Sequence, residues 1–389
     1  MPTDFSVRRF VVAALVAGVA STVVAQDKDK KDKADQVPTA ELAPVWVVMD
    51  SSMAGSAGVQ SGYGQFSYDV AAGATPADFK IEPTAADAGV TFELRNDFIK
   101  GQEGKIYVPF QLIIDKDKIT NPHLELSSRV APKGATGPEA PAMPVPAAAD
   151  KTKTTGAKAP HARYRWDDSW TVDLPATTSK YYRVTAALSV EPGSYDLYIG
   201  FRQKPAQGET ATSKVKVAVI KKELTVPALG EELSTSSIIV ADKVDVLQAA
   251  LPAERQRDNP YTFGQMKISP SDANRFLKKD DLNIIFWIYG VASDPATKKP
   301  NVLVDFSFNQ KLQSGEKYFN KTEPQELNAA TLPPQFDLAA GHQLPGSLQV
   351  PLASFPEGEY RLEIKISDKV SGKSISRDVM FTVAPSAVQ

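Results

Sequence analysis

The sequence predicts an all-β chain of two tandem immunoglobulin-like antiparallel β-sandwiches, preceded by a signal peptide and a short disordered charged leader. Three observations lead to this prediction. Apolar and polar residues alternate in most segments, with the period of half-buried strands. A strand pattern that begins Gly-x-Tyr occurs twice. Cysteine is absent from the 389 residues, so apolar burial has to stabilise the fold, and this length suffices for two ordinary domains.

The first 25 residues have the pattern of a secretory signal peptide. Arg8 and Arg9 form a basic start, an apolar run follows, and small residues precede Gln26. The run is too short to cross a bilayer comfortably, so we expect cleavage after Ala25 and no membrane span in the exported chain. The expected location is periplasmic or extracellular. Residues 26–36 are dominated by charged side chains and are expected to form the disordered leader.

Alternation predicts the strands that follow. Residues 106–114, 281–289 and 301–308 each place their apolar side chains on one face. The members of the first such set are Ile106, Val108, Phe110, Leu112 and Ile114. The clearest helical pattern covers residues 242–256, but Pro252 interrupts it.

An internal repeat relates the two halves. Residues 191–201 and 356–366 both contain Gly, one further residue, Tyr and then alternating apolar positions. Each segment is followed by a polar turn and a closing strand. Gly can adopt the backbone conformation of a tight turn, and Tyr195 or Tyr360 can bury its ring while its hydroxyl reaches a nearby backbone group. This arrangement is like the tyrosine corner of immunoglobulin-like sandwiches.

The repeat divides the chain into domains. We expect the first sandwich at residues 37–222 and the second at 223–389. Residues 131–162 interrupt the first sandwich with Pro, Ala, Lys and Thr and offer almost nothing to bury. A disordered insertion is predicted there, because strand patterns resume directly afterwards.

Four stretches of the second half carry a family resemblance: TVPALGEELSTSSIIVAD (225–242), NPYTFGQMKISP (259–270), RFLKKDDLNIIFWIYG (275–290) and FPEGEYRLEIKISD (355–368). With these stretches, the second half resembles the β-sandwich modules of uncharacterised secreted bacterial proteins. Some of those modules are attached to von Willebrand A-like or GWxTD-type regions. The resemblance implies the sandwich architecture and says little about activity, and the GWxTD signature itself is absent from this chain.

A possible cation site follows the apolar residues 45–49, which we interpret as a strand. A von Willebrand A site needs Asp-x-Ser-x-Ser at the end of such a strand to bind its cation with oxygen ligands. Asp50 and Ser52 fit this motif, but Ala54 occupies the third position, and no helical pattern follows. A strand that enters a loop explains the stretch, and a divalent-cation adhesion site at Asp50 and Ser52 is the alternative.

Aromatic residues are the main candidates for binding. Tyr164, Trp166 and Trp170 share a parity, so they would face the same way in an extended strand. An exposed face would offer the rings to a sugar or a protein, whereas a buried face would make them core anchors. Trp287 and Tyr289 pose the same choice. They lie opposite the predicted core residues of their strand, so this second apolar face suggests packing between the domains or against a partner.

The sequence contains no recognisable catalytic constellation. It lacks a Gly-x-Ser-x-Gly elbow and a phosphate-binding glycine loop, and its three histidines lack metal-ligand spacing. The nearly neutral charge gives no reason to expect nucleic-acid binding. We therefore expect a non-catalytic secreted or periplasmic interaction protein that needs no cofactor and presents both sandwiches to another envelope or secreted protein. The alternative is a carbohydrate-binding accessory module, in which the exposed aromatics would bind polysaccharide.

Overall fold

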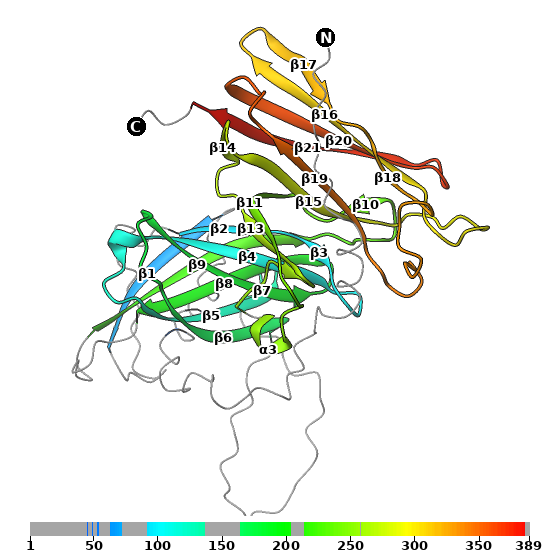
Figure 1. The fold of residues 1–389 in the computed structure, drawn as a ribbon. Helices are drawn as coiled ribbons and strands as arrows, with labels where there is room; N and C mark the ends of the chain where they lie inside the picture. Colours follow the sequence, from blue (N-terminus) through cyan, green and yellow to red (C-terminus); the bar gives the residue numbers. More distant parts are fainter. Residues whose placement is uncertain are drawn as a thin grey trace, which may run out of the picture. The chain divides into compact units, whose positions relative to one another are not determined.

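The structure is a computed structural model that describes residues 45, 49, 53, 63–71, 92–136, 164–203, 214–256 and 258–385. The regular secondary structure of the described chain is almost entirely β-strand in mainly antiparallel sheets, which confirms the predicted all-β class (Figure 1). The predicted signal peptide, the leader, Asp50, Ser52 and most of the insertion lie outside the described residues. Within the described ranges, no helix has the length and apolar character needed to cross a membrane.

The described residues form two compact units. The C-unit consists of residues 227–385 together with Asn96–Phe110, and the N-unit consists of the described residues before position 96 and from 111 to 226. The predicted boundary after residue 222 lies close to the observed one. The units differ from the predicted contiguous domains because Asn96–Phe110 precedes most strands of the first sandwich in sequence but packs within the C-unit.

The main sheet of the N-unit, called sheet N, has five strands. Its order is β1 (Tyr63–Ala71), β9 (Lys214–Val226), β8 (Gly193–Gln203), β5 (His123–Pro132) and β6 (Trp166–Asp173). A second sheet is centred on β4 (Ile106–Asp115), which pairs with β2 (Phe92–Asn96), β3 (Ile99–Lys100) and β7 (Tyr181–Val190). The apolar residues predicted to share one face of β4 are all buried.

The main sheet of the C-unit, called sheet C, also has a five-strand path. Its order is β14 (Arg275–Leu277), β21 (Ser374–Ala384), β20 (Gly358–Asp368), β16 (Val302–Leu312) and β17 (Gly315–Lys321), and β18 (Gln325–Leu327) also pairs with β16. The pairing of β14 with β21 is parallel. In the second sheet, β15 (Asp281–Tyr289) pairs with β10 (Ser234–Thr235), β11 (Ile239–Val246) and β19 (Leu344–Pro351), and β13 (Met266–Pro270) and β12 (Thr262–Phe263) follow beyond β11.

Sheets N and C share a strand order. The series β9, β8, β5 and β6 corresponds to β21, β20, β16 and β17. Both β8 and β20 begin with Gly-x-Tyr, so aligning Tyr195 with Tyr360 makes Gly200 equivalent to Lys365. The helical pattern predicted for residues 242–256 is wrong for its first part, which continues β11. Only α3 (Ala253–Gln256) is helical there, because Pro252 leaves room for a single turn.

The strand predicted at residues 45–49 is also wrong. Val45, Met49 and Met53 are helical and fully buried, and their spacing of four places them on one helix face. They pack on the outer face of sheet N with Tyr164, Tyr198, Val217 and Val219. Gly200 provides the space, since a Cβ at this position would lie 2.6 Å from Val45 Cγ1 and 2.8 Å from Met49 Sδ. A short apolar run is ambiguous between strand and helix, and this contact resolves it.

Candidate functional site

Both predicted tyrosine corners are present. The Tyr195 hydroxyl donates to the carbonyl oxygen of Glu191 at 3.0 Å, and the Tyr360 hydroxyl donates to that of Pro356 at 2.7 Å. Both rings are buried, and burial raises the pKa of Tyr360 to about 12. Each hydroxyl therefore ties the start of a central strand to the preceding turn, a structural role.

The aromatic residues at 164–170 do not share a face. In β6, Trp166 pairs with Val130 and Trp170 with Leu126, so both rings are on the face of sheet N that carries these buried apolar side chains. Tyr164 lies on the opposite face, because the chain bends at Arg165 before β6 begins. Its ring lies 4.6 Å from the Arg129 guanidinium carbon. The predicted common face is wrong for Tyr164, and the three rings form no exposed platform.

Trp287 and Tyr289 belong to a second core of the C-unit. Trp287 is fully buried and meets the Phe263 ring edge-on, with centroids 4.7 Å apart. The Tyr289 hydroxyl accepts the backbone N–H of Lys100 at 3.1 Å and bonds to Gln343 Oε1 at 3.1 Å. Burial raises the pKa of Tyr289. The second apolar face noted in the sequence is therefore covered by residues of the same unit.

The segment Asn96–Phe110 completes this core through hydrogen bonds as well as apolar contact. The backbone N–H of Phe98 donates to Ser237 Oγ at 2.9 Å. Tyr107 donates its hydroxyl proton to the Pro260 carbonyl at 2.9 Å, and Tyr261 donates to Asp97 Oδ2 at 2.9 Å. Burial and the Asp97 charge raise the pKa of Tyr261 well above its usual value. These long-range bonds were not predictable from local patterns.

Sheet N buries charged pairs on its outer face. Glu125 and Arg202 pair across β5 and β8 and are 1% and 5% exposed. On the same face, Lys221 Nζ lies 3.1 Å from Asp196 Oδ2. Burial acts to lower the pKa of Lys221, but the hydrogen bond to Asp196 and the nearby charges outweigh it and raise that pKa. The charged groups neutralise each other, which is the arrangement that a buried charge requires.

Sheet C instead exposes its outer face. Tyr318, Asn309, Arg361 and Met380 are successive cross-strand partners on this face. Tyr318 is 56% exposed and Met380 is 40% exposed. We call this row, with the carboxylates bound to Arg361, the Arg361 face.

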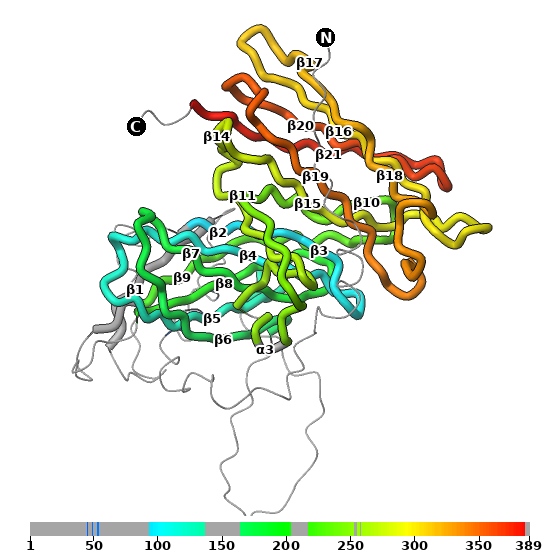
Figure 2. Tube along the Cα trace, viewed as in Figure 1, coloured from blue at the N-terminus to red at the C-terminus, as the bar shows by residue number. Residues whose placement is uncertain are grey.

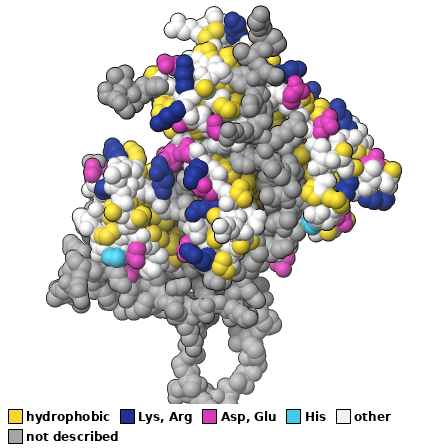
Figure 3. All heavy atoms as spheres, in the orientation of Figure 1, with side chains coloured by type: hydrophobic (Ala, Val, Ile, Leu, Met, Phe, Trp, Pro, Cys, Tyr) yellow, Lys and Arg dark blue, Asp and Glu magenta, His cyan; other side chains and the backbone are white. Residues whose placement is uncertain are grey.

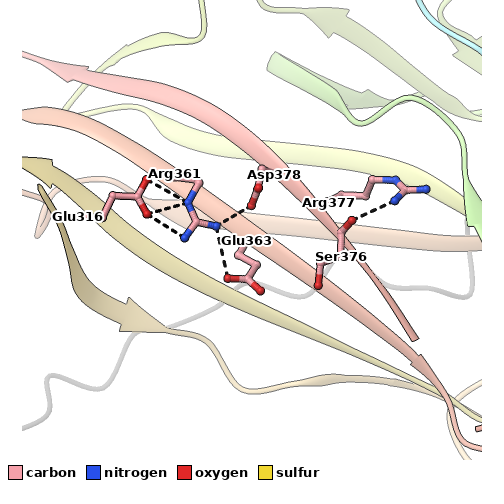
Figure 4. Close-up of polar contacts among 6 residues, drawn as sticks. All are labelled: Glu316, Arg361, Glu363, Ser376, Arg377 and Asp378. Atoms are coloured by element: carbon pink, nitrogen blue, oxygen red, sulfur yellow. Dashed lines mark hydrogen bonds and ion pairs between the residues drawn. The ribbon is translucent and has the colours of Figure 1, made fainter. Parts of the chain in front are cut away.

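The centre of the Arg361 face is an ion cluster (Figure 4). The Arg361 guanidinium lies 2.9 Å from Glu316, 2.7 Å from Asp378 and 3.4 Å from Glu363. Hydrogen bonds to Glu316 and Asp378 raise the pKa of Arg361. Three carboxylates around one guanidinium leave an excess of negative charge at the centre of the face. None of these residues was singled out in the sequence, because only strand register brings them together.

The edge of sheet C next to this face is β17 (Figure 2). Its residues from Gly315 to Tyr318 are exposed. Phe319 anchors the strand from the other face, with its ring centroid 4.9 Å from that of Phe355 and 5.6 Å from that of Tyr360. The edge strand is thus held against the sheet on both sides.

The Arg361 face offers an exposed ring, an exposed thioether and a cluster of charges, which are groups that can contact a ligand. Among the described residues, no three His, Cys, Asp or Glu side chains are grouped so that they could hold a metal ion. His123 pairs with Asp173, and His342 Nδ1 accepts the backbone N–H of Asp337, while His161 lies outside the described residues. In the view of Figure 3, acidic and basic side chains of the described residues are interspersed.

Comparisons with known proteins give no assignment. No family model and no curated protein sequence matches the chain. A solved structure, pT26-6p, is similar at 8% identity over 78% of this chain and 68% of that chain, with a TM-score of 0.18. A calcium binding mutant of Bacteroides uniformis beta-glucuronidase 2 matches at 6% identity over 82% of this chain and 33% of that chain, with a TM-score of 0.22.

Salmonella alpha-2-macroglobulin reacted with methylamine is a further similar structure, at 12% identity over 78% of this chain and 18% of that chain, with a TM-score of 0.19. The chain thus spans a third or less of the glucuronidase and macroglobulin chains. At such TM-scores, the matches transfer neither a function nor a ligand to this protein.

Proposed function

We propose that this chain is an exported, non-catalytic interaction protein that binds another envelope or secreted protein through the Arg361 face. The observation that carries the proposal is the exposure of Tyr318 and Met380 in one cross-strand row around the Arg361 cluster. The signal-peptide pattern of residues 1–25 supports the exported location.

The composition of the face suits protein recognition. Arg, Tyr and Met are enriched in protein interfaces, and Arg and Tyr are frequent among the residues that dominate binding energy. Arg361 is already fixed by Glu316 and Asp378, so little side-chain freedom is left to lose when a partner binds. The exposed carboxylates of Asp378 and Glu363 would attract basic groups of the partner, which favours orientation and fast association.

The carbohydrate-binding alternative has less support. A sugar platform needs exposed rings, whereas Tyr164, Trp170, Trp287 and Tyr289 are buried and Trp166 is half-buried. The cation alternative at Asp50 and Ser52 concerns residues outside the described chain.

Site-specific photo-crosslinking in producing cells would test the proposal. A photoreactive amino acid is placed at position 318, and a matched control carries it at Tyr181, which is 41% exposed in the N-unit. We expect one reproducible protein adduct at position 318 and none of that mass at position 181. Absence of an adduct at 318, together with retention of the chain on insoluble polysaccharide, would contradict the proposal and favour the carbohydrate alternative.

A further inference from the structure

The free edge of β17 offers unpaired backbone groups. In the described part of the chain, β17 pairs only with β16, and no residue of Gly315–Lys321 enters a backbone hydrogen bond outside the regular strand pairs. At the other end of sheet C, the short strand β14 covers part of the edge of β21. An unpaired strand edge presents a row of N–H and C=O groups that an extended segment of another chain can extend.

The edge is prearranged for such pairing. Arg361 reaches across β16 to bind both oxygens of Glu316, with Nε–O distances of 3.1 and 3.0 Å. On the opposite face, Phe319 packs on Phe355 and Tyr360. Because β17 is fixed from both faces, an incoming strand would meet an ordered template and less conformational entropy would be lost.

The charges of β17 select the kind of segment. Glu316 is bound by Arg361, whereas neither Lys317 nor Lys321 forms an ion pair among the described residues. Lysines on an edge strand oppose pairing with neutral or basic strands and with the same strand of a second copy of the chain. An acidic strand is the one class whose charges they complement. Tyr318, exposed between them, adds an apolar surface for a side chain of that strand.

We propose that β17 is a strand-addition site that binds an extended acidic segment of the partner protein. The inference rests on the proposed function and specifies how the partner binds. The acidic segment adds a sixth strand to the five-strand path of sheet C, forms main-chain hydrogen bonds with β17, and places carboxylates near Lys317 and Lys321.

Hydrogen exchange of the full chain with synthetic strand peptides tests this directly. The bulge in β17 turns Lys317 and Lys321 to opposite faces, because their partners Gln310 and Ser307 are three residues apart in β16. The probe is therefore a capped peptide of about eight residues that repeats Glu-Glu-Val-Val and so carries Glu on both faces, and its control repeats Lys-Lys-Val-Val. We expect the Glu peptide to slow amide exchange within Gly315–Lys321 and the Lys peptide to leave it unchanged. Two new surface ion pairs predict that the Glu peptide binds about fivefold more tightly at low salt than at high salt.

Charge reversal provides the specificity test. Lys317→Glu with Lys321→Glu should abolish protection by the Glu peptide and create protection by the Lys peptide. The matched control is Lys365→Glu with Lys369→Glu, which changes the net charge equally at two exposed positions away from β17. This control should behave like the unchanged chain, and thermal unfolding checks that both variants are folded.

Two results would overturn the inference. One is no protection of β17 by the Glu peptide, and the other is equal protection in the Lys317→Glu, Lys321→Glu variant. If position 318 still crosslinks to a protein in cells, the partner binds the Arg361 face without adding a strand, and the proposed function survives alone. Loss of both signals would reject the inference and the proposed function together.

Discussion

Sheets N and C have the same strand order, but their outer faces differ in solvent exposure. Sheet N buries that face, while sheet C leaves it in solvent. The difference is clear at the equivalent outward positions Gly200 and Lys365 and at their cross-strand partners. Gly200 pairs with Val219 in β9, whereas its equivalent Lys365 pairs with Ser376 in β21. Strand order therefore does not decide which face is covered.

The same contrast governs the charges. Arginines of sheet N lie in the interior with their carboxylates, and Arg361 of sheet C lies at the surface among three carboxylates. Breaking a buried ion pair costs much stability, because one charge stays buried without its partner. Breaking a solvated cluster costs little, because water solvates the charges that remain. The following experiments use this difference, from the largest expected effect to the smallest.

Removal of one arginine from each sheet should separate the two faces most strongly. Arg202→Met removes the cation beside the buried Glu125 and should lower the free energy of unfolding by about 4 kcal/mol. Arg361→Met should cost only about 1 kcal/mol. Urea unfolding at neutral pH measures both. As a control, adding Glu125→Leu to Arg202→Met should restore most of the stability, and equal losses at the two arginines would erase the contrast.

Exchange of the equivalent outward residues is the next test. Gly200→Lys places a long side chain where Val45 and Met49 pack, and it should cost about 3 kcal/mol through overpacking. Limited proteolysis should then cut near residues 45–53 more readily. The control at the equivalent position, Lys365→Ala, should stay within about 0.5 kcal/mol because its site is exposed. A stable Gly200→Lys protein that resists proteolysis would mean that Val45 and Met49 do not pack against Gly200.

The tyrosine corners should behave alike despite the different outer faces. Tyr195→Phe and Tyr360→Phe each remove one hydrogen bond to a backbone carbonyl and should each cost about 1 kcal/mol. Tyr181→Phe, at an exposed position, serves as the control without a measurable change. Thermal unfolding of the three variants suffices. If only one of these two substitutions lowered the stability, the correspondence between the sheets would be limited to strand order.

Acid should weaken the contacts at the end of β20 but not those at the equivalent end of β8. Gln203 accepts the backbone N–H groups of Thr120 and Asn121, and the equivalent Asp368 accepts that of Ala292. Burial acts to raise the pKa of Asp368, but the hydrogen bonds from Ala292, Ser371 and Val370 outweigh it and hold that pKa below 3.8.

The lowered pKa of Asp368 fixes the sign of the pH effect. Its stabilisation is complete above pH 3.8 and is lost as the pH falls through the folded-state pKa. Asp368→Asn should therefore cost about 1 kcal/mol at neutral pH and less below pH 3.8, as measured by urea unfolding at both pH values. The Gln203→Ala cost should not depend on pH, since Gln203 does not titrate. A constant Asp368→Asn cost would contradict the assigned ionisation.

Local patterns predicted the parts of the fold that local physics decides. Alternation predicted β4 at residues 106–114 and the observed strand is Ile106–Asp115, because the apolar side chains of one face recur at every second residue. The Gly-x-Tyr pattern predicted both tyrosine hydrogen bonds, which join residues only four positions apart.

Other features depend on contacts that no local pattern contains. Tyr164 departs from its neighbours' parity because the bend at Arg165 precedes β6. The Arg361 cluster unites residues from three strands through register. The covering of sheet N by Val45 and Met49 did have one signal in the sequence. Gly200 lies inside an apolar strand, a position that often marks close approach of another segment.

The position of Asn96–Phe110 affects how the chain can fold during synthesis. Asp97 leaves the ribosome 164 residues before Tyr261, its hydrogen-bond partner. Until then, the surface of Trp287 and Phe263 that this segment covers does not exist, and Ile99 and Tyr107 have no site in which to pack. Folding of the C-unit must therefore wait for nearly the whole chain, and a fragment that starts at residue 227 would expose an aromatic surface to aggregation.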